Sequence, residues 1–146
     1  MQPLSRKTML ALEAVIDVAV HARPEPVQAR EITDRQQVPQ RYLEQIMQAL
    51  VRADILRGVR GPRGGYRLAR ERRRISIGEI IRVIDSLDNN EEQVTLRSAL
   101  GQSVIMPLCD KVAENMRLEL DAITIEDLCR DAPNVATAIQ SEDFTI

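Results

Sequence analysis

Residues 57–68 read Arg57-Gly58-Val59-Arg60-Gly61-Pro62-Arg63-Gly64-Gly65-Tyr66-Arg67-Leu68, and this stretch decides the fold. Ile55-Leu56 and Tyr66-Arg67-Leu68 are predicted to pair as the short strands of a hairpin. The glycines at 61, 64 and 65 are expected to supply positive φ angles, and Pro62 to fix the turn. A structural turn needs no arginine, whereas guanidinium groups suit phosphate oxygens and groove edges. The stretch predicts a basic hairpin that contacts nucleic acid; the alternative is a solvated hairpin without a ligand.

Two predicted helices precede this hairpin. A short helix is expected over residues 27–36, with Val27, Ala29 and Ile32 on its apolar side. Gln37-Val38-Pro39 is predicted to form a turn, because proline suits the first helical position and disfavours helix before it. A longer helix is expected over residues 39–53. Its buried side is predicted from three-to-four spacing and comprises Leu43, Ile46 or Met47, and Leu50.

The opposite side of the longer helix carries amides, an arginine and a carboxylate, the groups that can read base edges in the major groove. Helix, turn, helix and basic hairpin is the order of a winged helix-turn-helix domain. We therefore predict a mainly α fold of this type, bound to double-stranded DNA. The predicted DNA-binding residues are Gln40, Arg41, Tyr42, Glu44, Gln45, Arg60, Gly61, Pro62, Arg63, Gly64, Gly65 and Tyr66. For Tyr66, packing of the wing on its own helices is an equal alternative.

Charge is distributed unevenly along a chain whose net charge is only −2. Residues 1–85 hold 16 Lys and Arg against 10 Asp and Glu, whereas residues 86–146 hold 4 against 12. A basic part beside an acidic part is typical of a protein that binds DNA on one face. The run Arg70, Arg72, Arg73 and Arg74 is interpreted as solvated.

Several motifs are similar to those of a known family. They are Tyr42-Leu43-Glu44-Gln45, Val59-Arg60-Gly61-Pro62-Arg63-Gly64-Gly65-Tyr66 and Ile123-Thr124-Ile125-Glu126-Asp127-Leu128. Over residues 4 to 130 the chain resembles the winged-helix regulators that include IscR, NsrR and CymR. The resemblance implies a sequence-specific transcriptional regulator, a repressor, that acts as a homodimer on an inverted-repeat operator.

A long helix is expected over residues 107–122, where Leu108, Val112, Met116 and Leu120 repeat every four residues. Such a stripe packs either on the chain's own core or on a partner, and the resemblance implies dimerisation through this helix. The predicted organisation is a DNA-binding domain at 1–85, a linker or sensor segment at 86–106, a dimerisation helix with a short terminal helix at 107–131, and a flexible tail at 132–146.

Cysteine content separates the chain from the cluster-binding members of the resembled family, which carry three cysteines before the long helix. Residues 86–108 contain none, and an iron–sulfur cluster needs several thiolates. We therefore predict no cofactor and no metal. The resemblance to the cluster-free members of the family implies a link to cysteine or sulfur metabolism, or thiol redox, and a co-regulator protein as a further partner. Cys109 is the candidate redox sensor, and Cys129 is expected to be a buried hydrophobe.

Other function classes remain as alternatives or are disfavoured. An iron–sulfur or nitrosative-stress sensor with unusual ligands, or a winged helix that binds only proteins, stays open. The sequence contains no nucleophile–base arrangement, phosphate loop or paired-carboxylate motif, so we predict no enzyme. No signal peptide or membrane-length segment is visible, which predicts a cytoplasmic location without a membrane partner. The first helix, expected over 4–22, is predicted to carry Met9, Leu12, Ile16 and Ala19 on one face.

Overall fold

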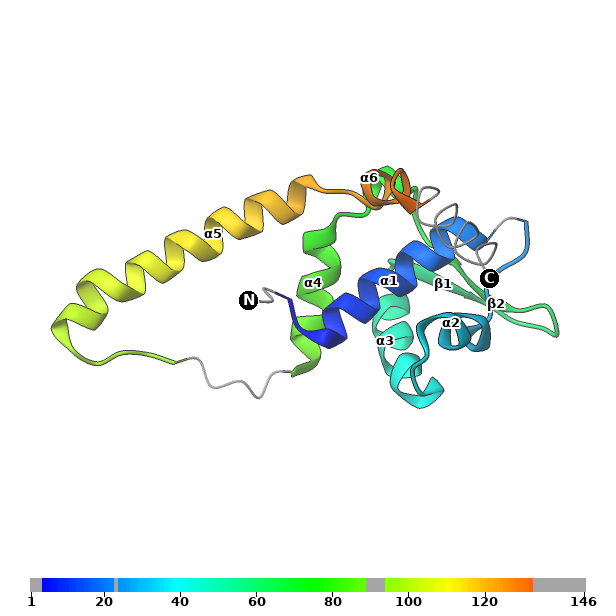
Figure 1. Ribbon diagram of the computed structural model, residues 1–146, viewed down its shortest axis with the longest axis horizontal. Helices are drawn as coiled ribbons and strands as arrows, with labels where there is room; N and C mark the ends of the chain where they lie inside the picture. The colour runs from blue at the N-terminus through cyan, green and yellow to red at the C-terminus, as the bar shows by residue number, and fades with distance from the viewer. Residues whose placement is uncertain (1–3, 23, 89–93, 133–146) are drawn as a thin grey trace, which may run out of the picture.

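The structure of the protein is a computed structural model, which describes residues 4–22, 24–88 and 94–132 (Figure 1). The elements are α1 (Arg6–His21), α2 (Ala29–Gln36), α3 (Gln40–Arg52), β1 (Leu56–Val59), β2 (Gly65–Leu68), η1 (Arg72–Arg74), α4 (Ile77–Asp85), η2 (Ser86–Asp88), η3 (Gly101–Ile105), α5 (Met106–Ala122) and α6 (Ile125–Cys129). Helices dominate, and β1 pairs with β2 in antiparallel fashion. The predicted winged helix-turn-helix fold with a long helix near the C-terminal end is confirmed.

The core lies between α1, α3 and α4, and Ile125 of α6 completes it. The predicted buried side of α3 is correct, since Leu43, Ile46, Met47 and Leu50 are all fully buried. These side chains form the α3 part of the core, and each contributes about 1.5–3 kcal/mol when removed from water.

The face predicted for α1 lies at the margin of its buried side: Ala19 is buried, and Leu12 and Ile16 pack against the edge of the core. Met9 is 38% exposed, and Leu12 and Ile16 are only half-buried. The buried residues of α1 are instead Thr8, Ala11, Ala14, Val15, Asp17, Val18 and Ala19. Small side chains let neighbouring helices approach closely on this side. The buried carboxylate of Asp17 is satisfied by Arg35 of α2, which donates two hydrogen bonds of 2.7 Å each.

The connection between α2 and α3 is set by two backbone conformations. Gln37 adopts the left-handed conformation with φ 57° and closes α2, donating its N–H to the Thr33 carbonyl at 2.7 Å. Pro39 is the N-cap of α3 and not its first helical residue, a shift of one position from expectation. The turn is therefore tight, and it presents the first turn of α3 to the solvent.

The wing differs from expectation at its root. Val27 was expected at the start of a helix but forms a β-bridge with Tyr66, with backbone hydrogen bonds of 2.7 and 3.0 Å. Of the three glycines expected to supply positive φ, only Gly61 does so, at 112°. Gly65 is needed for another reason, since a Cβ there would lie 2.4 Å from the Val27 carbonyl oxygen. At Gly64 a Cβ would lie 2.3 Å from the Val59 carbonyl oxygen.

The helix α5 leads away from the rest of the domain (Figure 1). Residues 99–122 are helical without a break, because a π-helical turn, η3, precedes α5; the helical segment thus begins earlier than residue 107. The expected flexible tail lies outside the described residues, apart from Ala132. Among the described helices, none is both long and apolar enough to cross a membrane.

The C-terminal end of α5 is fixed to α4, and we call this contact the α4–α5 junction: Gly78, Arg82, Arg117 and Asp121. Arg82 donates to Asp121 at 2.7 Å, and Arg117 donates to the other carboxylate oxygen at 3.1 Å. A Cβ on Gly78 would lie 1.9 Å from the Asp121 Oδ1 atom, so any other residue here would require this carboxylate to move. The junction therefore positions α5 relative to the helix-turn-helix and the wing.

Candidate DNA-binding surface

The outer side of α3 is polar because its apolar residues face the core. Gln40, Arg41 and Gln45 are exposed, whereas Tyr42 and Glu44 are half-buried. Gln40 donates its amide to the Glu44 carboxylate at 3.0 Å. No hydrogen bond or ion pair of the Arg41 side chain is found among the described residues. An exposed amide, a carboxylate and a guanidinium in the first two turns of a helix are suited to base edges.

The tip of the wing is equally accessible. Arg60, Gly61, Pro62 and Arg63 are all exposed. Arg63 is 86% exposed, and its 3.6 Å ion pair with Glu25, itself 65% exposed, is a weak surface contact. Arg63 can therefore exchange this carboxylate for a phosphate at little cost. The backbone turn is closed by a hydrogen bond of 2.9 Å from Gly64 to Gly61.

The α3 helix and the wing converge at Tyr66. Its backbone is held by the bridge to Val27, and its half-buried ring packs against the core. Burial raises the pKa of the Tyr66 hydroxyl, and the negative charge of Glu44 raises this pKa further. The Tyr66 hydroxyl therefore lies close enough to the Glu44 carboxylate of α3 to be influenced by its charge. Tyr66 thus packs the wing onto the domain while remaining at the edge of the surface.

A groove of about 670 Å³ lies between α3 and the wing. Its lining includes Gln48 and Arg52 of α3 as well as Arg60 and Tyr66 of the wing. Neither Gln48 nor Arg52 was among the predicted site residues. Their helical spacing from Glu44 and Gln45 was the signal that could have identified them.

Not all of the arginines near the wing are solvated, contrary to expectation. Arg70 donates to the carbonyls of Asp54 and Arg74 and to the Glu79 carboxylate, at 2.6–3.1 Å. Arg72 donates to the Ala19 carbonyl. Arg73 and Arg74 are exposed as expected.

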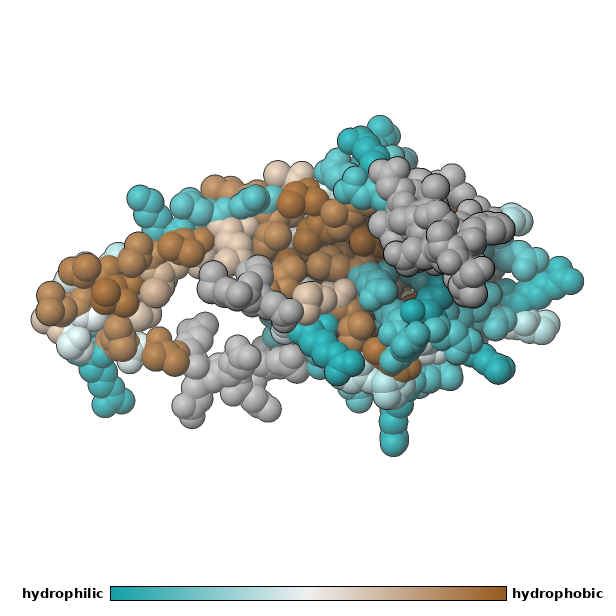
Figure 2. Space-filling view, in the orientation of Figure 1, coloured by the Kyte–Doolittle hydropathy of each residue, from teal (hydrophilic) through white to brown (hydrophobic). Residues whose placement is uncertain are grey.

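The predicted stripe on α5 is largely uncovered within the described chain. Leu108 is 55% exposed, Val112 53% and Met116 40%, while Leu120 is half-buried against the core. Figure 2 shows hydrophobic side chains running along α5 and hydrophilic ones around the wing. Packing of the whole stripe on the chain's own core, the alternative considered above, is wrong for three of its four residues.

The two cysteines occupy different environments. Cys109 is exposed on α5, whereas Cys129 is buried on α6, as expected. Between residues 94 and 105, Ser103 and Val104 are exposed, and Ser98 accepts the Gly101 N–H at 3.0 Å. In the described part of the chain, no group of three or more His, Cys, Asp or Glu side chains is arranged to hold a metal ion.

Comparison with known proteins identifies the family to which the chain is similar. The Rrf2 family, described as iron-dependent transcriptional regulators, matches residues 4–131. The transcriptional regulator IscR of Vibrio cholerae is 42% identical over 82 residues, which are 56% of this chain and 47% of that protein. The chain thus spans about half the length of the curated relatives that it matches.

Solved structures extend the likeness beyond the winged helix. IscR of T. potens is 35% identical, with a TM-score of 0.73 over 90% of this chain and 88% of that one. CymR, described as the global cysteine regulator of B. subtilis, is 28% identical, with a TM-score of 0.67 over 89% of this chain and 98% of that one.

Proposed function

This chain belongs to the Rrf2 family of DNA-binding transcriptional regulators, and from that premise we propose that it is a cytoplasmic repressor that binds an inverted-repeat operator as a homodimer, without an iron–sulfur cluster. The observation that supports this most directly is that the polar side of α3 and the arginine-bearing wing flank one groove. In this proposal α3 enters the major groove through Gln40, Arg41, Glu44 and Gln45, and the wing reaches phosphates or the adjacent minor groove through Arg60 and Arg63.

Homodimerisation is supported by the exposed apolar stripe of α5. Contiguous apolar surface of this kind is uncommon on a monomer and marks an interaction site. A two-fold pair of α5 helices would cover Leu108, Val112 and Met116 with their own counterparts. Two winged helices arranged in this way match two half-sites about 34 Å apart, or a multiple of that distance.

The family description implies iron, but the residues present do not fit a cluster. The chain has two cysteines, and one of them is buried on α6 while the other is exposed on α5. Because clusters are held by several thiolates, one chain cannot supply the usual ligand set. No step of the proposed function therefore passes through iron.

A link to cysteine or sulfur metabolism is the finer part of the proposal. It is supported by the likeness to the B. subtilis cysteine regulator over 98% of that chain. The exposed Cys109 beside the apolar stripe is placed where oxidation would alter the dimer surface, and a co-regulator protein is the alternative carrier of the signal.

The test is selection of bound sequences from random duplex DNA by the anaerobically purified full chain, followed by affinity measurements with and without thiol reductant. A colourless dimer that selects an inverted repeat supports the proposal. Reductant-dependent affinity that is lost in Cys109→Ser assigns the sensor. A brown protein would overturn the cluster-free reading, and absence of sequence selection would favour an interaction module or an obligate co-regulator.

Base readout by Glu44 has its own test. Glu44→Ala should alter the preferred base by about 1–3 kcal/mol at the position it contacts, because its carboxylate can accept from a cytosine amino group. Binding to random DNA should change little. Equal losses on selected and random DNA would exclude a readout role for this carboxylate.

A further inference from the structure

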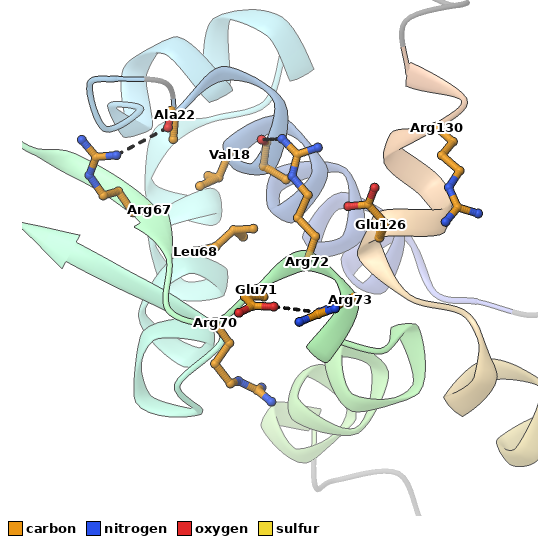
Figure 3. A pocket seen from close by; sticks show the side chains of 11 residues that line it. Val18, Ala22, Arg67, Leu68, Arg70, Glu71, Arg72, Arg73, Glu126 and Arg130 are labelled. Atoms are coloured by element: carbon orange, nitrogen blue, oxygen red, sulfur yellow. Dashed lines mark hydrogen bonds and ion pairs between the residues drawn. The ribbon is translucent and has the colours of Figure 1, made fainter.

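A second pocket lies outside the groove between α3 and the wing and shares none of the described residues that line that groove. Its volume is about 590 Å³, within the range of small-molecule sites. It is formed where the last turns of α1, the end of β2, η1 and α6 meet (Figure 3). Val18, Ala22 and Leu68 supply apolar surface. The five arginines that line it are Arg67, Arg70, Arg72, Arg73 and Arg130.

Three of these arginines are neutralised by neighbouring carboxylates. The pairs are Arg70 with Glu79 at 2.6 Å, Arg73 with Glu71 at 2.8 Å and Arg130 with Asp127 at 3.4 Å. These side chains therefore bring little uncompensated charge to the pocket.

Arg67 and Arg72 are held differently. Arg72 donates to the Ala19 carbonyl, and Arg67 donates to the Ala22 carbonyl at 3.5 Å and to the Pro24 carbonyl. These oxygens lie at the C-terminal end of α1 or just beyond it, where the helix carries only about half a negative charge. Each guanidinium has five N–H donors, so both retain donors and net positive charge.

We propose that this pocket binds a small organic anion, with its carboxylate or phosphate group held by Arg67 and Arg72 and its apolar body on Val18, Ala22 and Leu68. Guanidinium groups recognise both kinds of anion through paired hydrogen bonds. The site extends beyond the proposed function and does not depend on it, because none of the residues that line the pocket is among the proposed DNA-binding or dimerisation residues.

Glu126 allows a second test of the proposal, with an effect opposite to that of the arginines. It lines the same pocket from α6, on the other side of Arg72 from the apolar residues in Figure 3. Neither an ion pair nor a side-chain hydrogen bond of Glu126 is found in the part of the chain that the structure describes. Its carboxylate repels a bound anion, so its removal should strengthen binding while removal of Arg72 weakens it.

The experiment is titration of the full chain with benzoate and with phenyl phosphate at constant ionic strength, followed by NMR of the arginine Nε–H groups. Both anions should shift the Arg67 and Arg72 signals to saturation, and their relative affinities distinguish a carboxylate site from a phosphate site. Benzyl alcohol, which has the same shape without the charge, should produce no saturable shift.

Arg72→Gln should weaken binding about tenfold or more, and Glu126→Gln should tighten it severalfold. Arg74→Gln is the matched control, because Arg74 lies in the same turn but does not line the pocket. Opposite effects of the Arg72 and Glu126 variants cannot arise from simple loss of folding. Linear shifts without saturation, equal affinity in the Arg72 and Arg74 variants, or equal binding of benzyl alcohol would overturn the site.

Discussion

The helices α3 and α5 differ in whether their apolar residues are buried. Among the 13 residues of α3, five are buried, whereas none of the 17 residues of α5 is buried. The helix α3 is held by the core of its own chain and uses its other side for polar recognition. Packing within the chain accounts for the buried side of α3, whereas the described residues leave most of the α5 stripe uncovered.

The largest expected effect comes from exchanging a leucine for alanine in each helix. Leu43→Ala on α3 should lower the free energy of unfolding by about 2–5 kcal/mol, because it leaves a cavity in a filled core. Leu118→Ala on α5 should lower it by less than about 1 kcal/mol, since Leu118 is 56% exposed. Urea denaturation of both variants at one protein concentration measures the difference, and similar losses would remove the contrast between the helices.

Next in size is the effect of a charge on the α5 stripe. Val112→Asp should raise the dimer dissociation constant about a hundredfold, because a two-fold interface brings the new carboxylates together. The winged-helix domain should keep its fold and its circular dichroism spectrum.

Analytical ultracentrifugation over a range of concentrations measures the Val112→Asp effect. Asp110→Asn serves as the control, because it changes a charge roughly 200° around the helix from Val112. A dimer that survives Val112→Asp would place the dimer interface elsewhere.

A smaller effect, confined to DNA binding, is expected at the wing tip. Arg60→Ala should weaken binding to all duplexes and reduce the slope of log affinity against log salt by about one, as for one lost phosphate contact. Stability should be unchanged because Arg60 is exposed. Titrations at several salt concentrations, with Arg74→Ala as the control, test this; an unchanged slope would mean that Arg60 contacts no phosphate.

The smallest expected effect concerns Asp127, which belongs to the capping box of α6. Hydrogen bonds from Thr124 hold the pKa of Asp127 below its ordinary value. A carboxylate with a lowered pKa stabilises the fold above its unfolded value, about 3.9, and loses this effect as pH falls through the folded pKa.

Asp127→Asn should therefore cost stability at neutral pH, and the difference from wild type should shrink at acid pH. Urea midpoints between neutral pH and pH ~3 measure it. A difference that is constant with pH would mean that charge plays no part in this cap.

Local sequence patterns were sufficient to predict the environment of a residue wherever its partners lie nearby in sequence. The apolar spacing of α3 identified Leu43, Ile46, Met47 and Leu50 because a strongly amphipathic helix has one compatible orientation. The caps at Ser76 and Thr124 are local in the same sense, since each hydroxyl accepts the N–H of the residue three positions further on. These positions needed no knowledge of the rest of the fold.

Long-range contacts explain the failures. The buried carboxylate of Asp17 is satisfied by Arg35, 18 residues away, and the local spacing of α1 does not contain this contact. Val27 forms a bridge with Tyr66 across 39 residues, which removes it from the expected helix. The requirement for Gly65 follows from the same bridge, and no turn pattern contains it.

At the α4–α5 junction, α5 is held close to its C-terminal end through the Asp121 carboxylate, so a small change of angle there becomes a large displacement at its other end. With 17 residues, α5 is about 25 Å long, so a tilt of roughly 8° at Asp121 moves its far end by about 3.4 Å, the rise of one base pair. A side chain at position 78 would displace the Asp121 carboxylate that accepts from Arg82, so this pairing depends on the glycine. Gly78 therefore lies at the point where a small displacement would be amplified most along α5.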